Sequence, residues 1–233
     1  MGHRTVNLPL KTAGFSRHQN RRKYAKRRPH CARVIQFVCW NSWSLEIRGA
    51  SVVKTWFDCL EEAHLAFIAE QKMFFVGTAA PEGRVNIAPK DSDSLKVMAP
   101  NRIVWVNLTG AENETGAHWA DSKRMTLMWC SFNEKPMILR AYGHTDLIHP
   151  RDQAWEDLIG LFPARHGSRQ ILDLNVEFVL KSCGFGVPLY DFVGHRDTLR
   201  RWEERKGADG IRQHWEEYNQ TSIDGRPTGL LDG

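Results

Sequence analysis

Lys90 is the residue of this chain best placed to do chemistry, because it ends a stretch that is typical of a β-hairpin, FFVGTAAPEGRVNIAPK at residues 74–90. A β-rich run is followed by a Pro-Glu-Gly turn and then by a return strand in which Val85 and Ile87 alternate with polar residues. Pro89 lacks an N–H donor, which predicts a strand end or an edge strand. Lys90 is then expected at a strand terminus, where an ammonium can bind an anionic ligand while keeping most of its hydration. Taken alone, the segment is explained more simply as an ordinary hairpin that ends in a solvated lysine.

A second candidate is the polar stretch TGAENETGAH at residues 109–118, which is predicted to join a strand to a helix. The unpaired N–H groups at the start of a helix and the helix dipole both favour a bound anion. Glu112 and Glu114 are equally well explained as acidic residues that complement the dipole in a first helical turn. The junction is therefore either an anion site or ordinary helix-start chemistry.

Motifs for other chemistries are absent from the sequence. There is no GxSxG, HExxH, GxGxxG or GxxxxGK pattern, and the five cysteines form no CxxC pair. These absences argue against a serine hydrolase, a phosphate loop and a structural zinc site, and no metal site is predicted.

Several alternating segments must position these residues. Strands are predicted at residues 94–98, 102–108, 124–132, 137–149 and 170–179, and helices at residues 55–71, 151–161, 197–206 and 209–218. About six strands in succession with only short helices between them favour an antiparallel barrel or sandwich, so the fold class is mainly β with short helices.

Two of the alternations assign residues to faces. In residues 102–108, the sequence places Ile103, Trp105 and Asn107 on one face and Val104, Val106 and Leu108 on the other. In residues 170–180, Ile171, Asp173, Asn175, Glu177 and Val179 share one face, and Leu172, Leu174, Val176, Phe178 and Leu180 share the other. The first of these two faces is polar in its middle and is expected to be exposed.

The charge of the chain is concentrated at the N-terminus. The net charge of the 233 residues is +5, but residues 1–45 hold ten basic and no acidic residues, which leaves 22 basic against 27 acidic in the rest. Residues 1–51 are predicted to be a disordered extension. It is interpreted as a mitochondrial transit peptide, as a nuclear or nucleic-acid-binding patch, or as an upstream extension without a selected role, and the last is favoured. The predicted location is cytoplasmic, and no apolar run approaches the roughly 18 residues that an integral membrane helix needs.

Five ordered motifs resemble a known family. FFVGTAAPEGRVNIAPK, DSLKVMAPNRIVWVNLTGAENETGAH, RMTLMWCSF, RAYGH and CGFGVPLYDFVGHRDTLRRW together look like the pyridoxamine 5′-phosphate oxidase-like, FMN-binding split-barrel family, over roughly residues 53–228. The resemblance implies a split β-barrel domain at residues 52–194, a C-terminal helical extension at residues 195–233, and a homodimer that holds FMN between its subunits.

The resemblance also implies which residues bind the cofactor. Ala88, Pro89 and Lys90 would line the flavin side, with Lys90 paired to the phosphate or to the flavin carbonyl region. The junction residues Thr109, Asn113, Glu114 and Thr115 would form the phosphate-binding loop, and Arg124 and Arg140 are further cationic candidates.

The expected activity is that of an FMN-dependent oxidoreductase, which transfers hydride through flavin N5 to or from a small substrate. The junction is acidic, and WEERK at residues 202–206 differs from the arginine and histidine ending of the family's namesake, so oxidation of pyridoxamine phosphate is not expected. Two alternatives are a dimer that binds flavin, F420 or heme without turnover, and a structural dimer that has lost its ligand.

Overall fold

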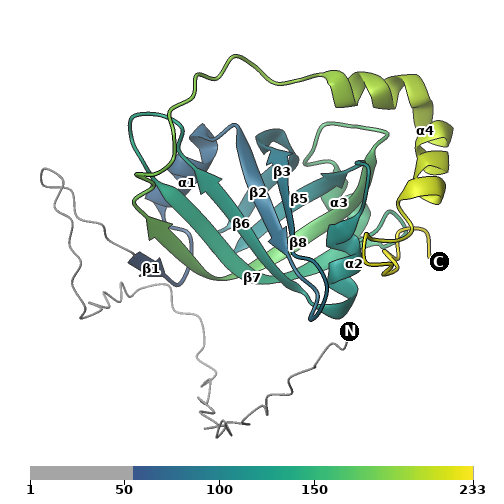
Figure 1. The fold of residues 1–233 in the computed structure, drawn as a ribbon, viewed down its shortest axis with the longest axis horizontal. Helices are drawn as coiled ribbons and strands as arrows, with labels where there is room; N and C mark the ends of the chain where they lie inside the picture. Colours follow the sequence, from purple (N-terminus) through teal and green to yellow (C-terminus); the bar gives the residue numbers. More distant parts are fainter. Residues whose placement is uncertain (1–54, 233) are drawn as a thin grey trace, which may run out of the picture. The chain divides into compact units, whose positions relative to one another are not determined.

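The computed structural model describes residues 55–232, and the predicted N-terminal extension lies outside them. An antiparallel sheet of eight strands dominates this part of the chain (Figure 1). The strands are β1 Thr55–Phe57, β2 Met73–Thr78, β3 Asn86–Asp91, β4 Leu95–Ala99, β5 Arg102–Leu108, β6 Arg124–Cys130, β7 Ile138–Ile148 and β8 Ser168–Ser182. The mainly β fold class is confirmed.

The order of the strands makes the sheet an open half-barrel. It runs β3-β2-β6-β7-β8-β5-β4, with β1 paired to β8. The two end strands, β3 and β4, are consecutive in the sequence and are joined by the three-residue 3₁₀ turn η1, Ser92–Ser94. Such a short link forces the two ends of the sheet toward each other, yet no strand pairing joins β3 to β4 in the described residues. This gap is the split of the barrel.

The predicted hairpin is confirmed. β2 and β3 pair antiparallel from Met73 opposite Asp91 to Thr78 opposite Asn86. β3 is an edge strand, which is the position predicted for Pro89. Residues directly opposite each other in a pair share a face of the sheet. Lys90, opposite the fully buried Phe74, therefore points to the inside of the half-barrel.

Two cores lie on the two sides of β5. The larger one fills the half-barrel and includes Ile103 and Trp105. The smaller one packs helix α3, Ala154–Ile159, against the other face of β5 and includes Val104 and Val106. The faces predicted for β5 are confirmed.

The other helices are α1 Glu62–Glu70, α2 Glu114–Asp121 and α4 Thr198–Tyr218, and the segment after β8 crosses one end of the sheet to reach α4 (Figure 1). The break predicted in α4 is confirmed, because Gly207 has φ 64° and separates two helical segments. None of the helices in residues 55–232 is long and apolar enough to span a membrane.

The predicted start of the first helix is wrong. Thr55 does not cap a helix but begins β1, where it lies opposite Lys181 of β8. The helix starts after Glu61, whose backbone N–H donates to His64 Nδ1 at 3.1 Å. Pairing with a long strand and the contact of Trp56 with Phe178, at 5.1 Å between ring centroids, outweigh the helical spacing of the apolar residues.

The strict alternation predicted for β8 is also wrong at its end. The register with β7 shifts between Tyr142, which lies opposite Phe178, and Gly143, which lies opposite Val176, so Glu177 is an extra residue in a β-bulge. The bulge reverses the faces that follow it. Val179 enters the large core, and Phe178 turns to the outside of the half-barrel.

Candidate functional site

Lys90 contacts β5 across the split. Its Nζ donates to Asn107 Oδ1 at 3.2 Å and lies 5.5 Å from the centroid of the Trp105 ring. Burial and, to a smaller extent, the charge of Arg169 lower the pKa of Lys90 to about 8. The prediction that this ammonium keeps most of its hydration is therefore wrong, because the return strand turns it inward.

Three buried amides extend the contact of Lys90 into the protein. Asn107 Nδ2 donates to Asn113 Oδ1 at 3.0 Å and to Gln170 Oε1 at 3.3 Å, and Asn113 Nδ2 donates to the same Gln170 oxygen at 3.0 Å. Helix α2 packs directly on them at Gly116, where an added Cβ would lie 2.8 Å from Asn113 Nδ2 and 3.1 Å from Gln170 Nε2. Only glycine fits here without a shift of the amides.

The surroundings of Lys90 are rich in donors that have no partner. Trp105 Nε1, Gln170 Nε2 and Arg169 Nε are all buried and have no hydrogen-bond partner within residues 55–232. Burial also lowers the pKa of Arg169, to about 9. Neither Lys90 nor Arg169 forms an ion pair with a carboxylate in residues 55–232. A half-buried lysine, a buried arginine and several unpaired donors are a combination that an anionic ligand with acceptor oxygens would stabilise.

Most of the junction residues are bonded within the protein. Thr109 Oγ1 donates to Gly167 O at 3.0 Å and accepts from Trp215 Nε1 at 2.8 Å, and a carboxylate oxygen of Glu114 accepts from Ile223 N at 2.7 Å. Asn113 belongs to the amide cluster described above. The predicted strand-to-helix junction is present, but the polar side chains of these three residues already have partners.

Thr115 is the junction residue that reaches the hairpin. Its Oγ1 accepts from Asn86 Nδ2 at 3.3 Å, and Asn86 also donates to Thr78 Oγ1 at 3.2 Å. The buried His118 completes this chain with Nδ1 at 3.0 Å from Thr78 Oγ1. These bonds join the start of α2 to β3, on the strand that carries Ala88 and Lys90.

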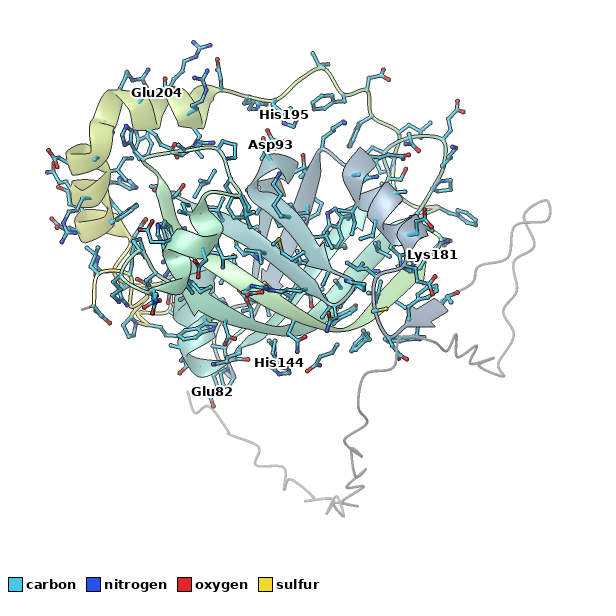
Figure 2. All side chains as sticks on the ribbon, turned by 180° about the vertical axis from the view of Figure 1, so that it is seen from behind. Glu82, Asp93, His144, Lys181, His195 and Glu204 are labelled. Carbon is cyan, nitrogen blue, oxygen red and sulfur yellow. The ribbon has the colours of Figure 1, made fainter. Side chains whose placement is uncertain are left out.

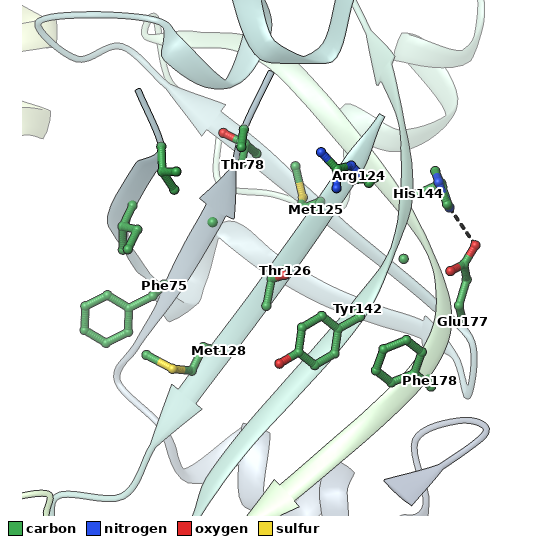
Figure 3. Close-up of a pocket in the computed structure, with 15 residues that line it drawn as sticks. Phe75, Thr78, Arg124, Met125, Thr126, Met128, Tyr142, His144, Glu177 and Phe178 are labelled. Atoms are coloured by element: carbon green, nitrogen blue, oxygen red, sulfur yellow. Dashed lines mark hydrogen bonds and ion pairs between the residues drawn. The ribbon is translucent and has the colours of Figure 1, made fainter. Parts of the chain in front are cut away.

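Arg124 lies on the other face of the sheet, where the outer groove opens (Figure 3). We use this name for a hollow of about 490 Å³ over β2, β3, β6, β7 and β8. Arg124 lines it together with the stacked rings of Tyr142 and Phe178, whose centroids are 4.7 Å apart. Arg140 is on the same face as Tyr142 and donates to Ser182 Oγ at 3.3 Å.

Pro89 faces this side as well, since it lies opposite Phe75, which lines the groove. At the rim, His144 Nδ1 lies 2.6 Å from Glu177 Oε1. Figure 2 shows that this rim, marked by His144, is well away from the turn η1 after β3, marked by Asp93. Seven of the nine predicted site residues are thus divided between the two sides of the sheet: Ala88, Lys90, Asn113 and Thr115 on the inner side, and Pro89, Arg124 and Arg140 on the outer side. The other two, Thr109 and Glu114, are bonded within the junction.

Sequence reasoning missed Asn107 and Gln170 as site residues, and it named His118 only within the polar stretch at residues 109–118. A signal was present for Asn107, because it is the one polar residue on an alternating face that otherwise holds Ile103 and Trp105. Gln170 begins the alternation of β8 and carries no comparable signal. Its role depends on the pairing of β8 with β5, in which it lies opposite Asn107.

Two comparisons with known proteins bear on the family of this chain. The family model described as pyridoxamine 5′-phosphate oxidase matches residues 60–183. A similar protein is the pyridoxamine 5′-phosphate oxidase family protein ustO from Aspergillus flavus, which is 30% identical over 175 residues, covering 67% of this chain and 70% of the relative.

Three solved structures are among those that are similar. A putative pyridoxamine 5′-phosphate oxidase from Lactobacillus delbrueckii has TM-score 0.43 and 16% identity and covers 52% of this chain and 93% of its own. An FMN-binding protein from Syntrophomonas wolfei has TM-score 0.38 and 15% identity, with 48% and 78% covered, and the heme storage protein HutZ from Vibrio cholerae has TM-score 0.39 and 15% identity, with 54% and 97% covered. On the family model and the Aspergillus relative, the chain belongs to the pyridoxamine 5′-phosphate oxidase family.

Proposed function

We propose that this protein binds FMN at the split of the half-barrel and acts as an FMN-dependent oxidoreductase on a small substrate. The observation that carries the proposal is Lys90, an inward-facing cation that has a neutral hydrogen-bond partner and, in the described part of the chain, no carboxylate partner. Membership of the pyridoxamine 5′-phosphate oxidase family supports a flavin as the ligand.

The phosphate of FMN suits the donors around Lys90. A phosphate monoester carries close to two negative charges near neutral pH and has three strong acceptor oxygens. Lys90 and Arg169 supply positive charge, and Gln170 and Trp105 supply N–H donors that lack partners. Thr115, at the start of α2, adds a hydroxyl close to β3. An anion at this site would offset the desolvation of both cations.

A second copy of the chain would complete the site. Arg124 and Arg140 lie on the outer face of the sheet, so within one chain they are separated from Lys90 by the sheet itself. Because β3 is an edge strand, a ligand that is bound beside Lys90 and extends past this edge could receive them from a partner chain. The apolar outer groove, with Val85 and Ile87 about 70% exposed at its edge, is the face that would pair.

FMN, when bound, supplies hydride transfer through its N5 atom. The chain's own residues bind and orient it. Lys90 would hold a positive charge beside the ring carbonyl region or the phosphate, and the amides of Asn107 and Gln170 would fix the position of Lys90. None of these residues has to act as a nucleophile.

The absorbance spectrum of the freshly purified protein tests the proposal. A flavin spectrum that is bleached by a reducing substrate is the expected result. A flavin spectrum that no reductant changes would contradict the oxidoreductase and leave a binding protein, and a heme or F420 spectrum would overturn FMN as the ligand.

The variant Lys90→Ala tests the residue that carries the proposal. It should lose bound FMN, while Lys96→Ala, which removes an exposed lysine from the nearby strand β4, should keep it. Flavin occupancy that is equal in both variants and in the unchanged protein would exclude Lys90 from the site.

A further inference from the structure

A turn near the C-terminus lies against both walls of the candidate site. This turn, Ser222–Gly225, is closed by Gly225 N donating to Ser222 O at 2.9 Å, and Gly225 has φ 74°. Ser222 Oγ stiffens it by accepting from Asp224 N at 3.3 Å and from Arg226 N at 3.1 Å. We call Trp215–Arg226 the C-terminal clamp, because its contacts join the hairpin to helix α2.

The first wall is the tip of the hairpin. The Asp224 carboxylate accepts from Arg84 N at 2.7 Å and also forms an ion pair with the Arg84 guanidinium. The fit is close at Gly83, which has φ 94°, where an added Cβ would lie 2.5 Å from Asp224 Oδ2. Asp224 thus fixes the turn that leads directly into β3.

The second wall is helix α2. At its start, Ile223 N donates to Glu114 Oε1 at 2.7 Å. At its end, Arg226 forms an ion pair with Asp121, and the same guanidinium donates through Nη2 to Glu82 O at 3.2 Å. Arg226 therefore joins the last turn of α2 to the hairpin tip with a single side chain.

The clamp also holds the loop before α2. Trp215 Nε1 donates to Thr109 Oγ1, and the fully buried Asn219 donates through Nδ2 to Gly110 O and to Ala111 O, at 3.2 Å each. Asn219 Oδ1 in turn accepts from Arg169 Nη1 at 2.5 Å. Arg169, whose charge contributes to the lowered pKa of Lys90, is thereby linked to the C-terminal clamp.

We propose that Asp224 and Arg226 are positioning residues for the ligand site: they hold β3 and α2 at the spacing at which Asn86 reaches Thr115. The identity of the ligand, FMN, rests on the proposed function. The positioning of β3 and α2 by Asp224 and Arg226 rests on the contacts described above. The clamp lies beyond residue 183, where the match to the family model ends. When the clamp is loosened, the bound ligand should leave the site faster.

Hydrogen exchange and ligand release together test the inference. In the full chain, Asp224→Ala and Arg226→Ala should each speed amide exchange in residues 82–88 and 112–118 about tenfold, since the loss of a charge-assisted hydrogen bond is worth roughly that factor. The rate of FMN release, followed by the return of flavin fluorescence, should rise by about the same factor. Exchange in β5 should not change. The variant Asp224→Asn keeps an acceptor for Arg84 N and should lie between the unchanged protein and Asp224→Ala.

Arg212→Ala is the matched control, because Arg212 pairs only with Glu216 on the exposed face of α4, with Nε and Oε1 3.2 Å apart. It should alter neither readout. Unchanged exchange in residues 82–88 in the Asp224 variants would overturn the inference, and so would faster exchange with an unchanged rate of FMN release. A protein that binds no FMN at all would refute the proposed function, and the exchange data would then decide the positioning role alone.

Discussion

Lys90 and Arg169 repel each other in a region from which water is largely removed, and an anion would relieve both effects. The desolvation that lowers the pKa of Lys90 to about 8 acts against the charged form of the side chain. A bound phosphate acts in the opposite sense, because it stabilises the ammonium. Binding of FMN is therefore expected to be coupled to the protonation of Lys90.

This coupling predicts a pH dependence with a definite sign. Below about pH 8 the free site already holds the proton, so affinity for FMN changes little through Lys90. As pH rises above the pKa of the free site, each bound ligand must recruit a proton, and the dissociation constant should increase roughly tenfold per pH unit. Fluorescence titrations of FMN from about pH 7 to about pH 10 measure it. The variant Lys90→Arg keeps its charge over this range and should lose most of the slope; an equally flat curve for the unchanged protein would show that Lys90 does not meet the phosphate.

At the scale of strands, the bulge at Glu177 determines which side chains of β8 line the outer groove. The extra residue turns Phe178 out to stack on Tyr142, and Val179 takes its place in the core. The bulge requires a close approach of two backbones at Gly143, where an added Cβ would lie 1.9 Å from Asn175 O. Because that neighbour is backbone, it cannot rotate away.

Gly143→Ala should therefore destabilise the fold strongly, by on the order of 3 kcal/mol, through overpacking in the sheet. Chemical denaturation followed by tryptophan fluorescence measures the change. Gly160→Ala is the control, since Gly160 has φ −65° and ψ −12° and an added Cβ there would meet nothing within 4 Å. Equal stabilities of the two variants would mean that the bulge is not as tightly packed as described.

Period-2 patterns predict the hairpin and the faces of β5, and the polar stretch at residues 109–118 predicts the junction before α2. The period-2 patterns do not predict the bulge, because alternation in the sequence does not show where one extra residue shifts the register of two paired strands. The first helix was misplaced for a different reason: Thr55 has the chemistry of a helix cap, but its pairing with Lys181 depends on a strand more than 100 residues away. The hairpin pattern predicts Lys90 as a site residue, whereas the place of Gln170 in the site follows only from the pairing of β8 with β5.

At the scale of the whole molecule, the division of the predicted site between two faces favours a two-fold assembly. In a two-fold dimer the same patch is presented by both copies, so each of two sites can receive its outer-face arginines from the other chain. One FMN per chain, and a loss of ligand when the copies separate, are the consequences. Monomeric protein with full flavin occupancy would disagree with this arrangement.

Ile87→Asp should separate the copies without unfolding either one. Ile87 is 70% exposed in the single chain and lines the outer groove, so an aspartate there costs little in the monomer but places a charge without a partner in an apolar interface. Sedimentation velocity should show half the mass of the unchanged protein, and bound FMN should fall with it. Val193→Asp introduces the same charge at a fully exposed valine outside the groove and should keep both the mass and the ligand. If Ile87→Asp stays paired, the two copies do not meet through the outer groove, and the arginines must serve another purpose.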